Sequence, residues 1–144
     1  MRTIALRFAN HFAPPEGTIY AHEKMIYENG FVWYGKIGQG ISEKTREIIM
    51  SNNPCRILLI HSGSDDRYWA NIREISKSIP QVQFIPEYYK DKYDKAGVWF
   101  CVTGFYKAPS DVMKKCRVVS SGRLLSEASK RCMNPVFLID YEEA

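Results

Sequence analysis

The stretch that decides the fold of this chain is RILLIH, residues 56–61. Its four consecutive large aliphatic residues predict a central strand that is covered on both faces. A polar turn cluster, SGSDD at 62–66, follows this strand, and the run RYWANIREI at 67–75 leads back beside it. Together these three segments predict a β-hairpin within a sheet.

The rest of the chain alternates short strands with a smaller number of helices. Apolar runs and turn signals predict further strands at 3–8, 31–37, 97–106, 117–120 and 135–140. Helices are predicted from a Thr18 N-cap to the stop signal Asn29-Gly30, from a Ser42 cap through 43–50, and over 124–132. Because the helices are too few for parallel crossovers, we expect an α+β fold, a curved, mostly antiparallel sheet or open barrel with short helices packed on it.

Length and charge limit the class of protein. The 144 residues predict a single domain over 1–144, either a whole protein or the N-terminal module of a longer one. The formal net charge of +4 is compatible with a polyanionic partner but is smaller than that of dedicated nucleic-acid binders. No apolar run approaches the roughly 18 residues of a membrane span, and Met1-Arg2-Thr3 leads directly into a strand. We therefore expect a cytoplasmic protein.

Cysteine and histidine positions predict neither a metal site nor a cofactor. The four cysteines form no CxxC pair, and the three histidines show no ligand spacing. Without a secretory signal the thiols are expected to be reduced. Two of them, Cys55 and Cys101, lie in apolar strand runs and are expected to be small buried residues.

Each of the three tryptophans lies in a predicted strand beside a second aromatic residue. The pairs are Trp33 with Tyr34, Trp69 with Tyr68, and Trp99 with Phe100. Neighbouring strand positions point to opposite faces, so each pair is expected to bury one ring and expose the other. Exposed rings on a small basic protein can stack on flat ligands such as nucleobases. The alternative is that all three tryptophans are core residues, and the most apolar strand makes Trp99 the strongest candidate for that.

Small residues at strand ends could also serve a ligand. Ser62 and Ser120-Ser121 are free to offer hydroxyls and backbone amides to its edge, unless they simply form turns. The glycine-rich segment 35–40 lacks the ending of a phosphate-binding loop, so a tight turn is favoured there. Lys36 within it can still meet a phosphate as a point charge.

The order of these signals resembles the EVE/YTH branch of the PUA-like folds. The segments that carry the resemblance are 32–38 (VWYGKIG), 56–63 (RILLIHSG), 67–70 (RYWA) and 98–100 (VWF). It implies recognition of a modified base that is flipped out of a nucleic acid into an aromatic pocket, at an unstacking cost of a few kcal/mol. DNA is the favoured polymer, as in modification-dependent restriction, with fused or separate motor and nuclease subunits as partners.

The resemblance also implies roles for individual residues. Trp33 and Trp69 would form the walls of the pocket, with Tyr34, Tyr68 or Trp99 as a third wall. Hydrogen bonds to the base edge would come from Ser62, Ser120 and Ser121. Phosphate contacts would come from Lys36, Lys107, Lys114, Lys115, Arg117 and Arg123. The chain departs from the YTH cage spacing, and its Tyr/Lys loop at 88–95 would either wedge into a duplex or cover the sheet.

Two alternatives to a non-catalytic reader stay open. One is a small amidohydrolase that acts on nucleosides, which would need a grouping such as Lys36 with Glu43 or Glu74. The other is a protein-interaction or oligomerisation domain whose exposed aromatics form the contact patch. The spacing of Lys36, Glu43 and Glu74 along the sequence does not join them into a catalytic set. His61 and Ser62 point to opposite faces of a strand, so we expect no enzyme.

Overall fold

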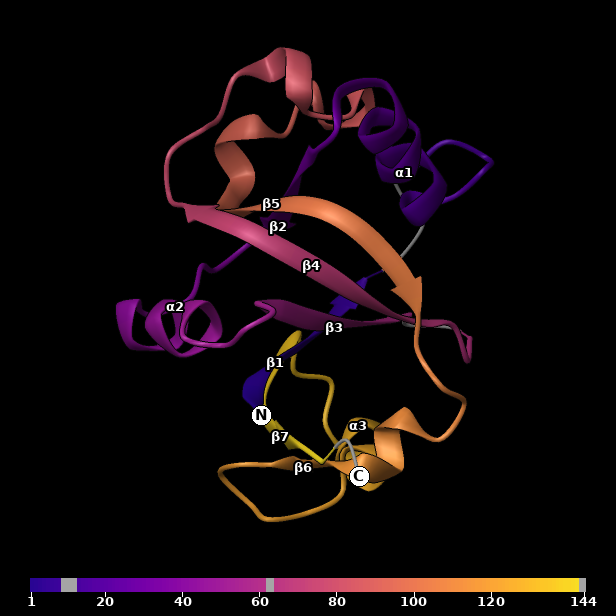
Figure 1. Ribbon diagram of the computed structural model, residues 1–144, viewed down its shortest axis with the longest axis vertical. Coiled ribbons are helices and arrows are strands. Elements are labelled where there is room, and N and C mark those ends of the chain that lie inside the picture. The colour runs from indigo at the N-terminus through magenta and orange to yellow at the C-terminus, as the bar shows by residue number, and fades with distance from the viewer. Residues whose placement is uncertain (9–12, 62–63, 143–144) are drawn as a thin grey trace.

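The computed structural model describes residues 1–8, 13–61 and 64–142 of the chain. Within these residues seven strands form one sheet in the order β2-β5-β4-β3-β1-β7-β6 (Figure 1). The strands are β1 (Arg2–Phe8), β2 (Val32–Ile37), β3 (Arg56–His61), β4 (Arg67–Ser76), β5 (Ala96–Lys107), β6 (Cys116–Val118) and β7 (Val136–Tyr141). Of the pairs they form, β1 with β3 is parallel and the others are antiparallel. The predicted α+β fold with a mostly antiparallel, open sheet is confirmed.

Three helices lie within the described residues: α1 (Thr18–Asn29), α2 (Glu43–Met50) and α3 (Leu125–Arg131). Ser42 caps α2 as predicted, because its hydroxyl accepts a hydrogen bond from the Thr45 amide at 3.1 Å. Gly30 ends α1 in the left-handed conformation, at φ 87°. Thr18 is not the cap of α1: Gly17 holds that position, and Thr18 is the buried first residue of the helix. Among the described helices, none has the length and apolar character needed to cross a membrane.

The hairpin of β3 and β4 lies within the sheet, as the RILLIH stretch predicts. Leu58 pairs with Trp69, and Leu59 pairs with Tyr68, along an antiparallel ladder. Residues 57–60 are all buried because successive side chains enter different layers. Leu59 joins the hydrophobic cluster that includes residues of α1 and α2, and Leu58 joins the cluster that includes residues of α3. Burial on both faces explains why this strand lacks an alternating pattern.

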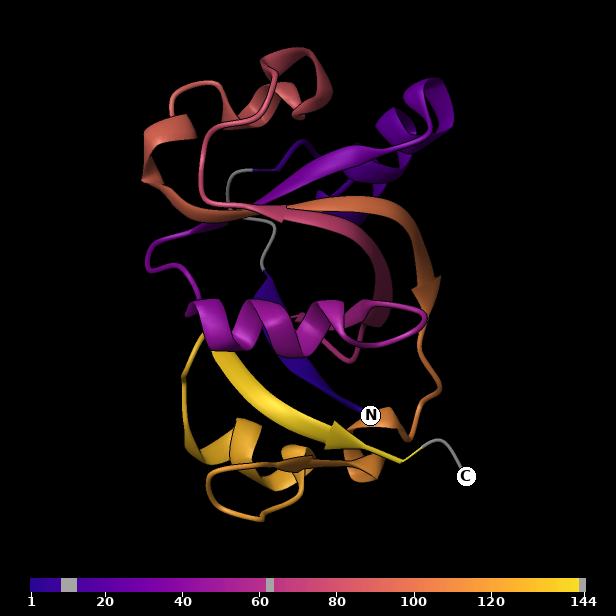
Figure 2. The same ribbon diagram turned by 60° about the vertical axis from the view of Figure 1, so that its left-hand side comes forward.

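Hydrophobic clusters cover both faces of the sheet. The cluster on one face contains Phe100 of β5 and Ile49 of α2. Two clusters cover the other face. The first contains Leu125 of α3, and in the second the segment 82–95 packs over Trp99. Figure 2 shows α3 and the 82–95 segment at opposite ends of the molecule. The Tyr/Lys loop therefore covers the sheet in this structure, where it forms short 3-10 turns.

Strand β6 ends earlier than the predicted 117–120, because the chain turns after Val118. The Val118 amide donates to the Arg123 carbonyl, and the Gly122 amide donates to the Val118 carbonyl, each at 2.8 Å. Gly122 has φ 72°, a left-handed conformation that glycine adopts without steric conflict. Ser120 and Ser121 consequently lie in an exposed turn and not in the strand.

Candidate functional site

A small cavity of about 180 Å³ lies where β1, β2, α1 and the turn at 87–89 meet. Its lining residues are Leu6, Arg7, Phe8, Ala13, Thr18, Tyr34, Gly35, Lys36, Ile37, Tyr88, Tyr89 and Pro135. We call it the tyrosine pocket, because three tyrosines contribute to its wall. Leu6 and Phe8 supply an apolar surface, whereas Thr18 and Lys36 supply polar groups. Its residues come from distant parts of the sequence, so only the folded chain forms it.

The tyrosine pocket is supported by a buried histidine. His22 of α1 is fully buried, with its Nδ1 atom 2.8 Å from the Thr18 carbonyl oxygen. Because a carbonyl only accepts, we assign the ring hydrogen to Nδ1 and leave Nε2 as the acceptor. Nε2 lies 3.3 Å from the Tyr89 hydroxyl, and the ring centroid of Tyr34 lies 4.8 Å from that of His22. Burial lowers the pKa of His22 to about 4, so the ring is neutral at pH 7.

The Tyr89 hydroxyl also contacts the backbone of Gly35 at the open edge of the sheet. Strand β2 is an edge strand, so alternate backbone groups have no partner strand. The Gly35 amide donates to the Tyr89 hydroxyl at 3.3 Å, and this hydroxyl lies 3.2 Å from the Gly35 carbonyl oxygen. A Cβ at position 35 would stand 2.6 Å from the Trp99 ring. The glycine is therefore required here by the packing of Trp99.

Lys36 belongs to the tyrosine pocket and not to an exposed phosphate-contacting surface. Only 7% of the residue is exposed, and its ammonium donates to the Gln39 carbonyl oxygen. Burial lowers the pKa of Lys36, because the charged form loses water. Gln39 uses one of the three N–H donors of Lys36, which leaves two for an acceptor on a ligand.

The tyrosine hydroxyls of the pocket stay protonated at neutral pH. Burial raises the pKa of Tyr88 to about 12, and burial raises the pKa values of Tyr34 and Tyr89 further above the ordinary value of 10. The Tyr88 and Tyr89 rings stack with centroids 4.4 Å apart and an interplanar angle of 24°. These two pocket residues are absent from the sequence-based site. The only signal for them is the Tyr-Tyr doublet in the aromatic and basic stretch after Pro86.

The expected convergence of Trp33 and Trp69 does not occur. Trp33 pairs with Cys101, which in turn pairs with Glu74 of β4. Glu74 lies five positions along β4 from Trp69, about 17 Å at the usual rise per residue. The two indoles also belong to different hydrophobic clusters. They cannot form facing walls of one base pocket in this structure.

The expectation of one buried and one exposed ring per pair was also wrong for the Trp33 and Trp99 pairs. Trp33 and Tyr34 are 8% and 6% exposed, and Trp99 and Phe100 are fully buried. The physical reason is that the sheet is covered on both faces, so alternation sends both rings into a core. Trp99 is the core residue that its apolar strand predicted.

The third tryptophan pair lies on β4. Trp69 is also buried; the Arg56 guanidinium stands 4.4 Å from its ring centroid, and the Tyr141 ring stands 4.9 Å away. Its neighbour Tyr68 is half-buried, and its ring lies 6.4 Å from that of Phe8. Of the predicted aromatic walls, Tyr34 therefore lines the tyrosine pocket and Tyr68 packs against one of its lining residues.

Of the remaining predicted contacts, those that the structure describes do not line this pocket. Ser62 lies outside the described residues. Ser120, Ser121 and Arg123 line a second hollow of about 340 Å³ beside α3. The other basic residues lie at or near the surface: Lys107 ends β5, Lys114 and Lys115 lie in the turn at 112–115, and Arg117 lies on β6. Among these, Lys115 pairs with Asp111 at 3.7 Å, and Arg117 donates to the Gly122 carbonyl at 2.9 Å.

The residues of a Lys/Glu catalytic set are not brought together. Glu43 is exposed at the start of α2, where it pairs with Arg46 and lies 3.9 Å from Lys77. Glu74 is exposed on β4. Neither carboxylate lines the tyrosine pocket that holds Lys36. Within residues 1–8, 13–61 and 64–142, no three His, Cys, Asp or Glu side chains gather in a way that could hold a metal ion.

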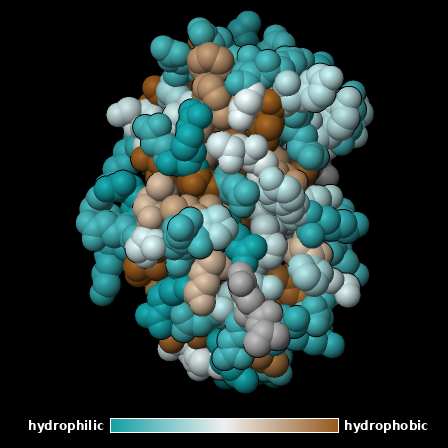
Figure 3. All heavy atoms as spheres, in the orientation of Figure 1, coloured by the Kyte–Doolittle hydropathy of each residue, from teal (hydrophilic) through white to brown (hydrophobic). Residues whose placement is uncertain are grey.

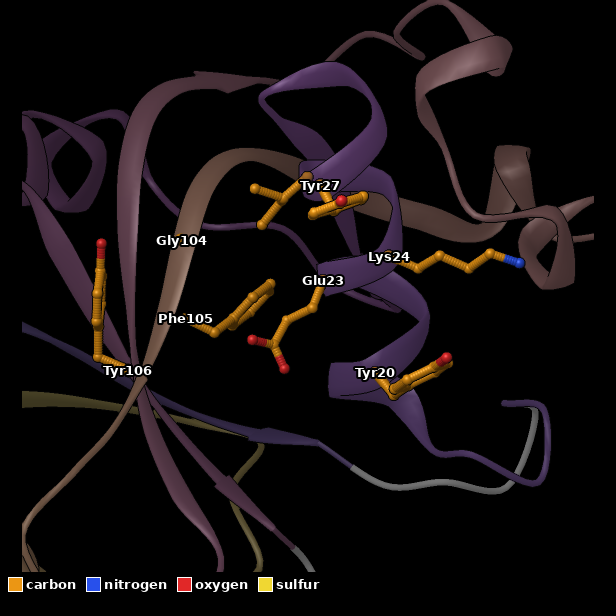
Figure 4. Close-up of a pocket in the computed structure, with 8 residues that line it drawn as sticks. Tyr20, Glu23, Lys24, Tyr27, Gly104, Phe105 and Tyr106 are labelled. Atoms are coloured by element: carbon orange, nitrogen blue, oxygen red, sulfur yellow. The ribbon is translucent and has the colours of Figure 1, made fainter.

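A larger and more open groove of about 570 Å³ lies between α1 and the end of β5. Tyr20, Tyr27 and Tyr106 line it and are exposed. Figure 4 shows the Glu23 carboxylate extending from α1 toward Phe105. Lys24 also lines the groove and offsets the charge of Glu23, so the groove has no net charge that would attract a polyanion. It contains none of the predicted site residues. On the face seen in Figure 3, hydrophobic residues appear as small areas between hydrophilic ones.

The class of this protein follows from a family match that covers most of the chain. A family model described as Pua-like matches residues 4–136, so the chain belongs to the Pua-like family. PUA-like domains generally bind nucleic acids, which supports this activity at a general level. Neither the curated proteins nor the solved structures give a significant match to the chain. The resemblance is therefore confirmed for the superfamily, and the EVE/YTH branch stays a prediction.

Proposed function

We propose that this protein binds a modified base that has been flipped out of a nucleic acid, with the base seated in the tyrosine pocket. The observation that carries the proposal is the junction of β1, β2, α1 and the 87–89 turn, which gathers Tyr34, Lys36 and Tyr88 around one cavity. DNA is the favoured polymer, and the protein acts as a reader without catalysis. Motor or nuclease subunits, fused or separate, would give such a reader its effect.

The size of the pocket favours a single flat group. Its volume of about 180 Å³ is below the range of about 300–1,000 Å³ that is typical for drug-sized ligands. A planar heterocycle suits this space better than a complete nucleotide does. The sugar and phosphate would then stay outside, which is the arrangement that base flipping requires.

The chemistry of the lining supports a base as the ligand. Stacking on aromatic side chains contributes about 1–3 kcal/mol per base. The neutral hydroxyls of Tyr34 and Tyr88 and the Lys36 ammonium can donate to ring nitrogens and carbonyl oxygens of the base, which supplies the discrimination that stacking lacks. Leu6 and Phe8 offer an apolar surface to a methyl group, worth about 0.8 kcal/mol when fully buried. Because this increment is small, selectivity also requires exclusion of other bases by shape.

A second candidate function is hydrolysis of an acylated nucleoside, which the lowered pKa of the buried Lys36 favours. Such a lysine can act as a base or a nucleophile more readily than an exposed one. Against this, no carboxylate lines the tyrosine pocket among the described residues. Release of free acid from acylated nucleosides, abolished by Lys36→Met, would support the enzyme.

Fluorescence titration of matched duplexes tests the reader. One duplex is unmodified, and the others carry 5-methylcytosine, 5-hydroxymethylcytosine or N6-methyladenine; single-stranded RNA carrying N6-methyladenine is included. We expect one modified duplex to bind at least tenfold more tightly than the unmodified one, and Tyr88→Leu to remove this preference. Tyr27→Leu is the control, because Tyr27 is 93% exposed on α1. Equal binding of all ligands at low salt, or binding of none, would overturn the proposal.

A further inference from the structure

The second hollow, which we call the arginine hollow, lies between the turn after β6, α3 and the start of β7. Its polar lining residues are Ser120, Ser121, Arg123, Arg131 and Asn134. We propose that the arginine hollow binds a phosphodiester group of the nucleic acid whose base occupies the tyrosine pocket. This inference rests on the proposed function and assigns the serines to a phosphate instead of a base edge.

The charge of the hollow is one-sided. Its charged lining residues are Arg123 and Arg131, and no carboxylate lines it among the described residues. Both arginines are exposed, and neither guanidinium has an ion-pair or side-chain hydrogen-bond partner in the described part of the chain. Two unneutralised guanidiniums beside one hollow attract an anion, and their planar geometry matches two phosphate oxygens.

The turn that carries the serines holds the hydroxyl group of Ser121 in place. The Ser121 hydroxyl accepts from the Arg123 amide at 3.3 Å, which leaves its hydrogen free to donate to a ligand. The Arg117 guanidinium donates to the Gly122 carbonyl at 2.9 Å and ties the turn to β6. Serine hydroxyls and arginines are among the donors that proteins use for phosphate oxygens of nucleic acids.

Arg7 joins the arginine hollow to the tyrosine pocket. Its guanidinium donates to the carbonyls of Ser129 at 2.6 Å, Cys132 at 2.8 Å and Asn134 at 3.0 Å. These bonds fix the segment that links α3 to β7. Asn134 lines the arginine hollow, and the next residue, Pro135, lines the tyrosine pocket.

The two sites consequently meet along one stretch of backbone. In a nucleic-acid strand every internal base has a phosphate on each side of its sugar, so a base in one site brings a phosphate toward the other. Arg7 acts here as a positioning residue, because its guanidinium donates to backbone carbonyls of the protein.

The test compares two double variants that each remove two positive charges. Arg123→Ala/Arg131→Ala removes the guanidiniums of the arginine hollow. Lys44→Ala/Lys77→Ala is the control, since both lysines are exposed and neither lines either site. The affinities of wild type and both variants for the modified and unmodified duplexes are measured across a salt series. The free modified nucleoside, which lacks phosphate, is titrated separately by calorimetry.

We expect the arginine variant to bind both duplexes about tenfold more weakly, because hydrogen bonds to charged groups are the stronger ones. The slope of log affinity against log salt should become shallower by about 0.9 for each phosphate that the variant no longer neutralises. The preference for the modified base and the affinity for the nucleoside should not change. The lysine control should keep the wild-type affinity and slope.

The other possible results distinguish the proposed phosphate site from the proposed base reader. If the arginine variant matches the lysine control while the modified-base preference persists, the phosphate site is overturned and the reader stands. If wild type shows no base preference but the arginine variant loses affinity and slope, the anion site stands and the reader falls. Absence of any duplex binding by wild type at low salt overturns both.

Discussion

The Nε2 atom of His22 lies 3.3 Å from the Tyr89 hydroxyl, and this contact joins α1 to the turn at 87–89 beside the tyrosine pocket. The same hydroxyl accepts from the Gly35 amide of the edge strand β2. Three elements that are distant in sequence thus meet at one phenol oxygen. We therefore expect the shape of the pocket to depend on these contacts. Single substitutions at the residues involved test each contact separately.

The stability of the protein should fall on mild acidification because of His22. Its pKa is about 4 in the folded protein and 6.5 ordinarily, so the unfolded chain takes up a proton first as the pH drops. The free energy of unfolding that the neutral His22 ring contributes is on the order of 3 kcal/mol. It is fully present above pH 6.5 and is lost between about pH 6.5 and 4. Urea unfolding at several pH values measures it. His22→Gln should flatten this part of the curve; an identical decline in both proteins would refute the prediction.

Removal of the Tyr89 hydroxyl should destabilise the protein without removing the ring. Tyr89→Phe leaves the Gly35 amide and the His22 acceptor without this partner, and unsatisfied buried groups cost about 1–3 kcal/mol. The control is Tyr27→Phe, whose parent ring is 93% exposed. Equal urea midpoints for wild type and Tyr89→Phe would show that the hydroxyl contacts contribute nothing.

A methyl group at position 35 should disturb the packing of Trp99. Gly35→Ala places a Cβ 2.6 Å from this ring, and overpacking of a core costs about 1–3 kcal/mol. Gly104→Ala is the matched control on β5, because its new Cβ would meet the end of the Tyr106 side chain, which is 58% exposed and can move. Denaturant unfolding should rank Gly35→Ala well below Gly104→Ala, and the reverse order would contradict the packing argument.

Replacement of Lys36 should affect stability and binding in opposite directions. Burial disfavours its charged form, so Lys36→Met should unfold at a higher denaturant concentration than wild type. The loss of a charged donor in the pocket should lower the affinity for the preferred modified duplex by at least about tenfold. A purely structural lysine would instead lose stability on substitution, and binding would follow only from unfolding.

Local sequence patterns were sufficient for most of the secondary structure, although the Thr18 cap and the end of β6 were predicted wrongly. The continuous apolar run at 57–60 predicted the central strand β3, Ser42 predicted the start of α2, and Gly30 predicted the end of α1. Each of these predictions depended on only a few neighbouring residues. The sequence-based site was less accurate. Of the aromatic walls, Tyr34 lines the tyrosine pocket, whereas Trp33 and Trp69 lie in separate clusters.

The α+β class, the hairpin within the sheet, the Ser42 cap of α2 and the end of α1 at Gly30 are determined by the sequence alone, because hydrophobic spacing and turn residues act over short distances. Which aromatics line a cavity was decided by the tertiary structure. Strand register put Trp33 and Trp69 far apart, and layers on both faces of the sheet buried rings that alternation alone would expose. The packing of α1 and of the 87–89 turn against β2 brought Tyr34, Lys36 and Tyr88 together, because long-range contacts depend on the whole fold.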